Sequence, residues 1–375
     1  MSTGPAILTA HVGSLSYPNS APPPEGELAQ AVADVVARQR LIGLDVVNEG
    51  EYSKRSDWLS YLDDRFDGFE ERDPVAGEVP LIARGGAGRP SRTSTAMRRS
   101  GARSSTSRAA RSAPGGRSGS ARLPSATGAA SATREEIALL RGAVGEGPGF
   151  LTSTVPASVE VYRENEHYAS EEEFLFALAE ALGEEYRLIA GAGLILQVDD
   201  AWLPALRDRI GIEMGLEAFR DRCSLRIEAL NHALAGVPEE QVRYHLCWGS
   251  WHGPHAFDLE MRHIVDLMLR VNAVAYLFEA GNVRHEHEYE VSDEVSLPEG
   301  KVIVPGVVSH ATDVIEHPEL VSQRLQRFAE RVGRENVLGG ADCGFGGRSH
   351  PDVAWAKLAV LVEGAERATR ALAAR

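Results

Sequence analysis

The sequence predicts an α/β protein, a single (β/α)8 TIM barrel. Short β-rich runs alternate with amphipathic helical runs, as in the βα units that build a parallel sheet. Eight such β-rich runs occur, and 375 residues are enough chain for eight units. Polar residues end seven of these eight runs, which is where such barrels place their active sites.

The predicted elements follow one another in regular order. The β-rich runs are 7–14, 44–49, 149–155, 194–199, 243–248, 274–279, 302–307 and 337–342. The helical runs are 25–42, 171–190, 215–235, 259–270, 318–332 and 351–373. Ser170 is a suitable N-cap for the helix at 171–190, and acidic residues fill that helix's first turn. We find no internal repeat, and we expect residues 1–375 to form one barrel domain.

One segment, residues 83–134, differs from the rest of the chain. It holds eleven of the 39 basic residues, none of the 54 acidic ones, and otherwise mostly Gly, Ala, Ser, Thr and Pro. Such a composition buries too little apolar surface to offset the entropy of ordering, so we expect a disordered or irregular insert. One interpretation is a basic arm that binds an anion or nucleic acid. The favoured one is a shifted reading frame, restored by a second compensating change.

Bulk composition narrows the class of protein. The hydrophobic fraction of 43% supports a large core, and three cysteines indicate a reducing compartment rather than a disulfide framework. Residues 1–24 lack the pattern of a signal peptide, and no apolar run reaches membrane-spanning length. A net charge of −15 disfavours nucleic acid as a partner. We therefore expect a cytoplasmic enzyme, with a homo-oligomer left open.

Three strand ends carry the ligand types of a metal site. His245 and Cys247 alternate along one run, so both point to the same face of the strand. Cys343 and Glu279 end two other runs. One imidazole, two thiolates and a carboxylate suit zinc (Zn2+). Zinc held this way keeps a substrate thiol ionised at neutral pH, which predicts a thiol alkyltransferase. The third cysteine, Cys223, is expected to be an inert buried thiol.

Other polar residues at strand ends are candidates for substrate contact. His11 and Ser14 lie at the end of the first run, and Glu51 follows the second. Asp199 suits either an ammonium group or a helix cap. The loop that begins at Trp248 and includes His252 is rich in aromatic and glycine residues, which favours a loop that shapes the substrate site.

Two histidine-bearing stretches complete the candidates. His310, just past the seventh run, is placed to act as a general acid. The stretch Arg-His-Glu-His-Glu-Tyr-Glu at 284–290 spaces its histidines for no single helix face, and we interpret it as a solvated acidic loop.

Together these pieces resemble the C-terminal catalytic barrel of cobalamin-independent methionine synthase. The sequence most resembles the single-barrel members labelled methionine synthase II-like, a group also similar to epoxyalkane:coenzyme M transferase. The matching motifs run in the family's order and cover the chain except for 83–134. They are His-Val-Gly-Ser at 11–14, Asn-Glu-Gly-Glu at 48–51, Gln-Val-Asp at 197–199, His-Leu-Cys at 245–247, Phe-Glu-Ala at 278–280 and Ala-Asp-Cys-Gly at 341–344.

The resemblance implies a role for each matched residue. The zinc ligands would be His245, Cys247, Glu279 and Cys343. Ser14, Glu51 and Asp199 would hold the amino-acid end of a homocysteine-like thiol, and His310 would donate a proton. The implied reaction moves a methyl group from a donor, N5-methyltetrahydrofolate in methionine synthase, to that thiol.

Departures from the family limit what transfers. Methionine synthase carries an additional N-terminal barrel, which we do not expect in this protein, and the loop after the metal strand is different. The segment 83–134 falls where the family places substrate-lining structure. The thiol chemistry therefore transfers more safely than the methyl donor. The alternatives are an epoxide-opening coenzyme M-type transferase and a catalytically defective zinc-binding barrel; a zinc hydrolase is a weaker option.

Overall fold

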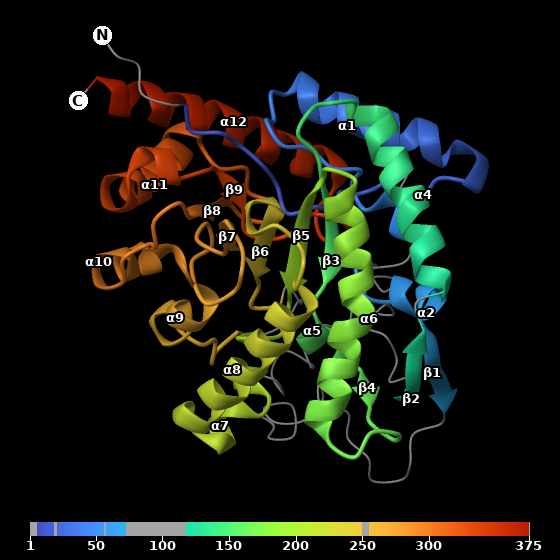
Figure 1. Cartoon of the computed structure of the whole chain (residues 1–375). Coiled ribbons are helices and arrows are strands. Elements are labelled where there is room, and N and C mark those ends of the chain that lie inside the picture. Colours follow the sequence, from blue (N-terminus) through green and yellow to red (C-terminus); the bar gives the residue numbers. More distant parts are fainter. Residues whose placement is uncertain are drawn as a thin grey trace, which may run out of the picture.

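A computed structural model describes residues 6–18, 21–55, 58–72, 118–125, 127–249 and 255–374. Its centre is a curled, parallel, six-stranded sheet in the order β3-β5-β6-β7-β8-β9 (Figure 1). The strands are β3 Phe150–Thr154, β5 Ile195–Asp200, β6 Val242–Leu246, β7 Ala275–Phe278, β8 Val302–Val308 and β9 Gly340–Ala341. Because all are parallel, their carboxyl ends meet at one edge.

The predicted first and second strands take part in the sheet only through single bridges. The parallel bridges join Thr9 to Gly339, Ala10 to Val46, and Val47 to Gly149. Here side chains form hydrogen bonds with backbone groups that would pair with a neighbouring strand in a regular sheet. Asp45 Oδ2 accepts from the Thr9 N–H at 2.7 Å, and the Gln39 amide bonds both the N–H and the C=O of Asn48 at 3.0 and 2.6 Å. Regular strands at 7–14 and 44–49 were therefore wrong in extent.

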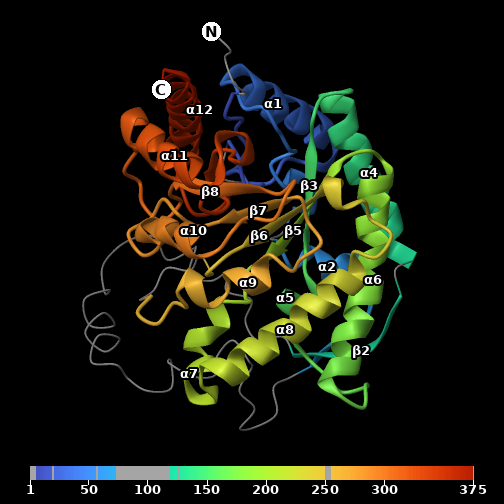
Figure 2. The same cartoon turned by 60° about the vertical axis from the view of Figure 1, so that its left-hand side comes forward.

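Long helices surround the sheet, as both views show (Figures 1 and 2). They are α1 Leu28–Leu41, α4 Thr127–Val144, α6 Glu171–Gly191, α8 Leu216–Ala233, α11 Pro318–Val332 and α12 Pro351–Ala373. The helices predicted at 25–42, 171–190, 215–235, 318–332 and 351–373 are confirmed within a few residues, and the Ser170 side chain accepts from the Glu173 N–H as expected. None of the helices in the described ranges is long and apolar enough to cross a membrane.

Short elements fill the connections. The predicted helix at 259–270 is only η7 Met261–His263 and α9 Val265–Met268. The other short helices are η1 Glu25–Glu27, η2 Tyr52–Lys54, α2 Tyr61–Arg65, α5 Pro156–Glu160, η5 Ala205–Asp208, α7 Gly211–Met214, η6 Glu239–Gln241, η8 Glu286–Glu290, α10 Val291–Glu294 and η9 Arg334–Asn336.

The curl of the sheet encloses a small interior of its own. Val12 packs there with residues of β7 and β8, namely Ala275, Leu277 and Val304. The guanidinium of Arg243 lies 4.2 Å from the ring centre of Phe150, across the same interior. The larger core lies between the outer face of the sheet and the helices. Alternation along each strand therefore sends Arg243 and His245 inward, and Tyr244 and Leu246 toward the helices.

The segment that the sequence marks as irregular is partly ordered. β1 Asp67–Arg72 pairs antiparallel with β2 Ser118–Ser125, and β2 pairs with β4 Arg163–Glu164. Helix α4 begins at Thr127, and Thr133 is fully buried with its hydroxyl 2.8 Å from the Ala129 carbonyl. The predicted end of the insert at 134 was therefore wrong, because a packed helix covers 127–134. Residues 83–117 lie outside the described residues.

A buried ionic cluster joins the chain on either side of that segment. Arg65, at the end of α2, bonds Glu136 of α4 at 2.9 Å and Glu185 of α6 at 3.0 Å. Ser53 Oγ and Ser153 Oγ donate to the same two carboxylates, each at 2.6 Å. These contacts join Ser53 and Arg65, which precede residues 83–134 in the chain, to Glu136 and Glu185, which follow them. Ser153 of β3 bonds the same Glu185.

Candidate metal centre

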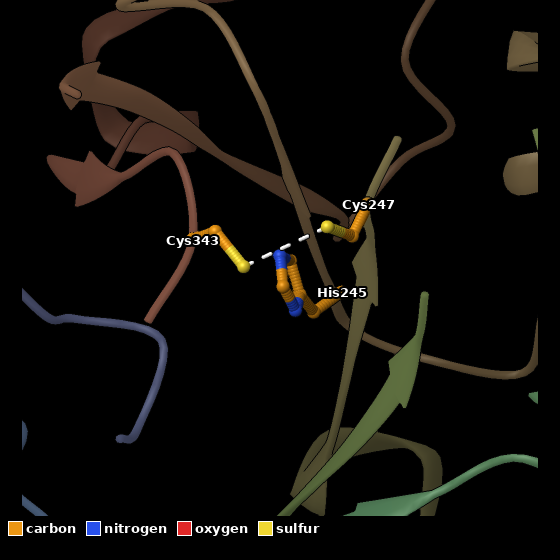
Figure 3. A group of neighbouring side chains, drawn as sticks. All are labelled: His245, Cys247 and Cys343. Atoms are coloured by element: carbon orange, nitrogen blue, oxygen red, sulfur yellow. Dashed lines mark hydrogen bonds between the residues drawn. The ribbon is translucent and has the colours of Figure 1, made fainter. Parts of the chain in front are cut away.

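Three buried side chains meet at the carboxyl edge of the sheet. His245 lies in β6, Cys247 follows it, and Cys343 follows β9. Their donor atoms all lie within 4.8 Å of one another, and the two sulfur atoms are 3.6 Å apart. Figure 3 shows the imidazole of His245 beside the line that joins the two sulfurs. The prediction that strands distant in sequence bring these three residues together is confirmed.

The donors fit a tetrahedral ion such as Zn2+. Sulfurs that each lie about 2.3 Å from such an ion are about 3.8 Å apart, close to the separation found here. His245 Nδ1 is bonded to Asp199 Oδ1 at 2.9 Å, whereas the buried Nε2 has no hydrogen-bond partner among the described residues. A buried nitrogen beside two thiols, with its lone pair unused, is what a metal ligand requires.

Glu279, the predicted fourth ligand, lies next to this group but is not part of it. Its Oε1 is 3.8 Å from Cys247 Sγ and accepts the Trp248 N–H at 3.1 Å. Its Oε2 accepts from Asn282 at 2.7 Å and from Arg284 at 2.8 Å. Glu279 as a ligand stays a prediction.

The two thiols are hydrogen-bonded to each other. The hydrogen bond from Cys247 lowers the pKa of Cys343, with help from the Arg348 guanidinium, and the same bond raises the pKa of Cys247. Arg348 Nη1 lies 3.7 Å from Cys343 Sγ. One thiolate is therefore stabilised before any ion binds, and a positive charge already stands beside it.

His11 and Ser14 lie in one turn but differ in what they do. Both ring nitrogens of His11 are engaged, Nε2 with Gln39 Oε1 at 2.8 Å and Nδ1 with the Gly13 N–H at 3.2 Å. Burial lowers the pKa of His11 to about 4, so the ring is neutral. These bonds favour a role in shaping the turn, and substrate contact by His11 stays a prediction. The Ser14 carbonyl accepts N–H bonds from Phe345 and Gly346, which places Ser14 against the loop after Cys343.

Glu51 is held in a strained backbone conformation. Its φ of 61° is rare for a residue other than glycine, and such strain is concentrated at functional sites. Its Oε1 accepts from Thr152 Oγ1 at 2.9 Å, and Lys54 Nζ donates to the same hydroxyl at 2.5 Å. Burial raises the pKa of Glu51, while Lys54 opposes the rise. A Cβ on Gly13 would lie 2.8 Å from Glu51 Oε1, so the Ser14 turn and Glu51 are immediate neighbours.

His310 follows β8 and is only 5% exposed. Burial lowers its pKa, although the charges of Cys343 and Glu279 act in the opposite direction. Its Nδ1 has no hydrogen-bond partner among the residues that the structure describes. The imidazole of His310 therefore lies near enough to Cys343 and Glu279 for their charges to act on it, and its lowered pKa favours the neutral form.

The loop after β6 differs from its predicted role. The Trp248 indole is 1% exposed, and its N–H donates to the Leu259 carbonyl at 2.7 Å, so the side chain packs inside the protein. Contact of Trp248 with a substrate has no support in this geometry. His252 lies outside the described residues.

The interpretation of 284–290 as a solvated loop was wrong for its first two residues. His285 is 2% exposed, and its Nδ1 lies 2.8 Å from Glu288 Oε2. Arg284 bonds both Glu279 and Asp258, with the Glu279 contact at 2.8 Å. Arg284 therefore connects this stretch to Glu279, the predicted fourth ligand.

Sequence reasoning missed three basic residues, Lys54, Arg284 and Arg348. Each follows a strand-end carboxylate or thiol within three to five residues. Because a buried anion requires a nearby cation, a basic residue shortly after each of these groups could have been predicted to be its partner.

Comparison with known proteins finds similarity to methionine synthases. No model of a protein family matches the chain. The methionine synthase of Thermococcus kodakarensis is 25% identical over 221 residues, which is 59% of this chain and 57% of that protein. The methionine synthase of Saccharolobus islandicus is 27% identical over 217 residues, 57% of this chain and 56% of that protein. The matched region thus spans little more than half the length of these relatives.

Two solved structures have the same fold. A B12-independent methionine synthase from Shewanella sp. W3-18-1, in complex with selenomethionine, has a TM-score of 0.73 at 19% identity and covers 99% of this chain and 100% of that one. A putative B12-independent methionine synthase from Listeria monocytogenes has a TM-score of 0.63 at 17% identity, covering 96% and 98%.

Proposed function

We propose that this chain is a member of the cobalamin-independent methionine synthase family and a zinc-dependent transferase that moves a methyl or alkyl group to a small thiol. The methionine synthases that are 25–27% identical to it and the shared fold support this proposal. The observation that carries the proposal is the meeting of one buried imidazole and two thiols within 4.8 Å. The preferred acceptor is homocysteine, and the preferred donor is of the folate type.

His245, Cys247 and Cys343 would hold the ion, with Glu279 as the fourth ligand. When bound, Zn2+ lowers the pKa of a coordinated thiol, so the thiol is a nucleophile at neutral pH. Cys247 and Cys343 are buried, which keeps water away from their sulfurs. Arg348, 3.7 Å from Cys343, partly offsets the negative charge that gathers there.

Charged residues beside the metal group suit an amino-acid thiol. Glu51 is acidic and largely buried, which suits an ammonium group, and Ser14 lies beside it. Lys54 and Arg348 bring positive charge to the same region, which suits a carboxylate. An ammonium and a carboxylate on one small molecule match this distribution better than either charge alone.

The transfer needs one proton. The thiolate sulfur forms a bond to the donor's carbon, the bond from that carbon to the leaving nitrogen or oxygen breaks, and the leaving atom takes a proton. His310 is the buried group that we assign to this proton, which solvent then restores. Replacing His310 by Gln should lower kcat and leave the KM for the thiol nearly unchanged. An unchanged kcat would remove His310 from the mechanism.

The extent of the domain and the closure of the barrel are part of the same proposal. We infer one domain over 1–375, a closed barrel of eight parallel positions. The six strands and the bridges at Thr9, Ala10, Val46 and Val47 support this arrangement, because each position pairs with the next around the sheet.

Two assays separate this function from its rivals. Zinc-loaded protein is supplied with homocysteine and methyltetrahydrofolate, and separately with an epoxide and coenzyme M. Methionine in the first assay supports the methionine synthase reaction, and a thioether in the second supports the epoxide-opening alternative. Zinc that is bound but unchanged by added thiols, with neither product, would support a catalytically defective barrel and refute the proposal.

A further inference from the structure

Asp199 and His245 face each other across neighbouring strands. They are register partners in the parallel pair β5–β6, so their side chains lie on the same inner face. Asp199 Oδ1 lies 2.9 Å from His245 Nδ1, and the histidine side chain is 3% exposed. The carboxylate therefore contacts the ring on the side away from the two sulfurs.

Further residues fix the carboxylate in this position. Gln197 Nε2 donates to the same Asp199 oxygen at 2.9 Å. The Gln197 Oε1 in turn accepts from Arg243 Nη2 at 2.6 Å, and Gln197 is fully buried. Since all these residues alternate inward on β5 and β6, the sheet itself sets their spacing.

The hydrogen bond determines which ring nitrogen is free. A carboxylate only accepts, so His245 Nδ1 must carry the proton and donate it. The lone pair then lies on Nε2, the atom that has no hydrogen-bond partner among the described residues. Metal-binding histidines commonly have their other nitrogen bonded to a carboxylate in this way.

We propose that Asp199 is a positioning residue of the metal site, which orients His245 and presents Nε2 to the ion. This inference rests on the proposed metal site. The contacts with His245 and Gln197 both use Asp199 Oδ1.

The test measures metal affinity, which a substrate-binding residue would not change. Apo-protein is titrated with Co2+, followed by the absorption of the cobalt–thiolate bands, and its Zn2+ affinity is measured by competition with a chelator. The variants are Asp199→Ala, which removes the acceptor, and Asp199→Asn, which keeps an acceptor oxygen of the same shape. Asp352→Ala, at an exposed position, is the matched control. Circular dichroism checks that each variant folds.

The proposal predicts that Asp199→Ala weakens Zn2+ binding by about 10–100-fold, and that Asp199→Asn restores part of the loss. Asp352→Ala should bind like the unmodified protein. Unchanged metal affinity in both Asp199 variants, with a raised KM for homocysteine, would overturn the positioning role while leaving the proposed function intact. An unmodified protein that binds neither Co2+ nor Zn2+ would overturn both.

Discussion

The sulfur atoms of Cys247 and Cys343 lie 3.6 Å apart although 96 residues separate them in the chain. Strands β6, β7, β8 and β9 are neighbours in this order, so the two cysteines approach across the interior rather than along one strand. Packing alone has no need for two thiols at this distance, which is too long for a disulfide. Shared coordination of an ion, as proposed above, would hold the two sulfurs at about this separation.

Metal content should depend on two of the three cysteines. Replacing Cys247 or Cys343 by Ala removes a proposed ligand, so Zn2+ affinity should fall by more than the roughly 100-fold that an outer contact costs. Cys223→Ala is the matched control, because this thiol is also buried but lies in helix α8 against the Leu203 carbonyl. Elemental analysis should find one zinc per chain in the control. Equal zinc in all three variants would contradict the site.

Glu51 should recognise the amino group of the thiol. Glu51→Gln removes the charge and keeps the shape, so kcat/KM for homocysteine should fall about 10–100-fold, the effect of about 1.5–3 kcal/mol for a charged hydrogen bond. The comparison is 4-mercaptobutyrate, which lacks only the amino group. Its kcat/KM should be nearly the same in the variant and the unmodified enzyme. A parallel loss for both thiols would show that Glu51 acts otherwise.

His285 should make stability depend on pH. Burial lowers its pKa, but the Asp258 carboxylate 3.6 Å from Nε2 and the hydrogen bond to Glu288 outweigh burial and raise it to about 9, above the ordinary 6.5. The stabilisation is therefore fully present below pH 6.5 and is lost as pH rises through about 9, a change on the order of 3 kcal/mol. Urea unfolding from pH 6 to 10 should show this decline, and His285→Gln should flatten it.

The exposed His287, two residues away, provides the control for that measurement. His287→Gln should keep the decline of the unmodified protein. The same decline in His285→Gln would assign the pH dependence to other groups.

Arg65 should stabilise the fold, because it joins helix α2 to helices α4 and α6. Arg65→Ala leaves Glu136 and Glu185 buried without their cation, and breaking such a cluster costs about 3–5 kcal/mol in the free energy of unfolding. Arg262→Ala breaks only exposed ion pairs and should cost less than about 1 kcal/mol. Urea unfolding measures both. Similar costs for the two variants would mean that the cluster does not hold the fold together.

The strand-end residues were predictable because period-two alternation and parallel pairing constrain them. His245, Cys247 and Cys343 needed only those two rules to be placed together. The irregular first two strands were not predictable, because the side chains of Asp45 and Gln39 take ladder positions that the pattern assigns to backbone. Helix α4 was hidden because its first turns, at 127–134, share the composition of the segment before them.

Partners of the site were harder to predict than its ligands. The contact of Arg284 with Glu279 depends on how a short loop folds back, and no periodicity encodes it. The orientation of Asp199 toward His245 required the register of two strands 46 residues apart. Sequence alone left Asp199 equally suited to a cap or a substrate contact.

The most direct test of the central claim is X-ray absorption at the zinc edge, recorded with and without homocysteine. Zinc bound by His245, Cys247 and Cys343 should show two sulfur neighbours at about 2.3 Å, and a third on adding the thiol. A spectrum with two sulfurs under both conditions would contradict thiol activation at this site, and one with no sulfur neighbours would contradict the site itself.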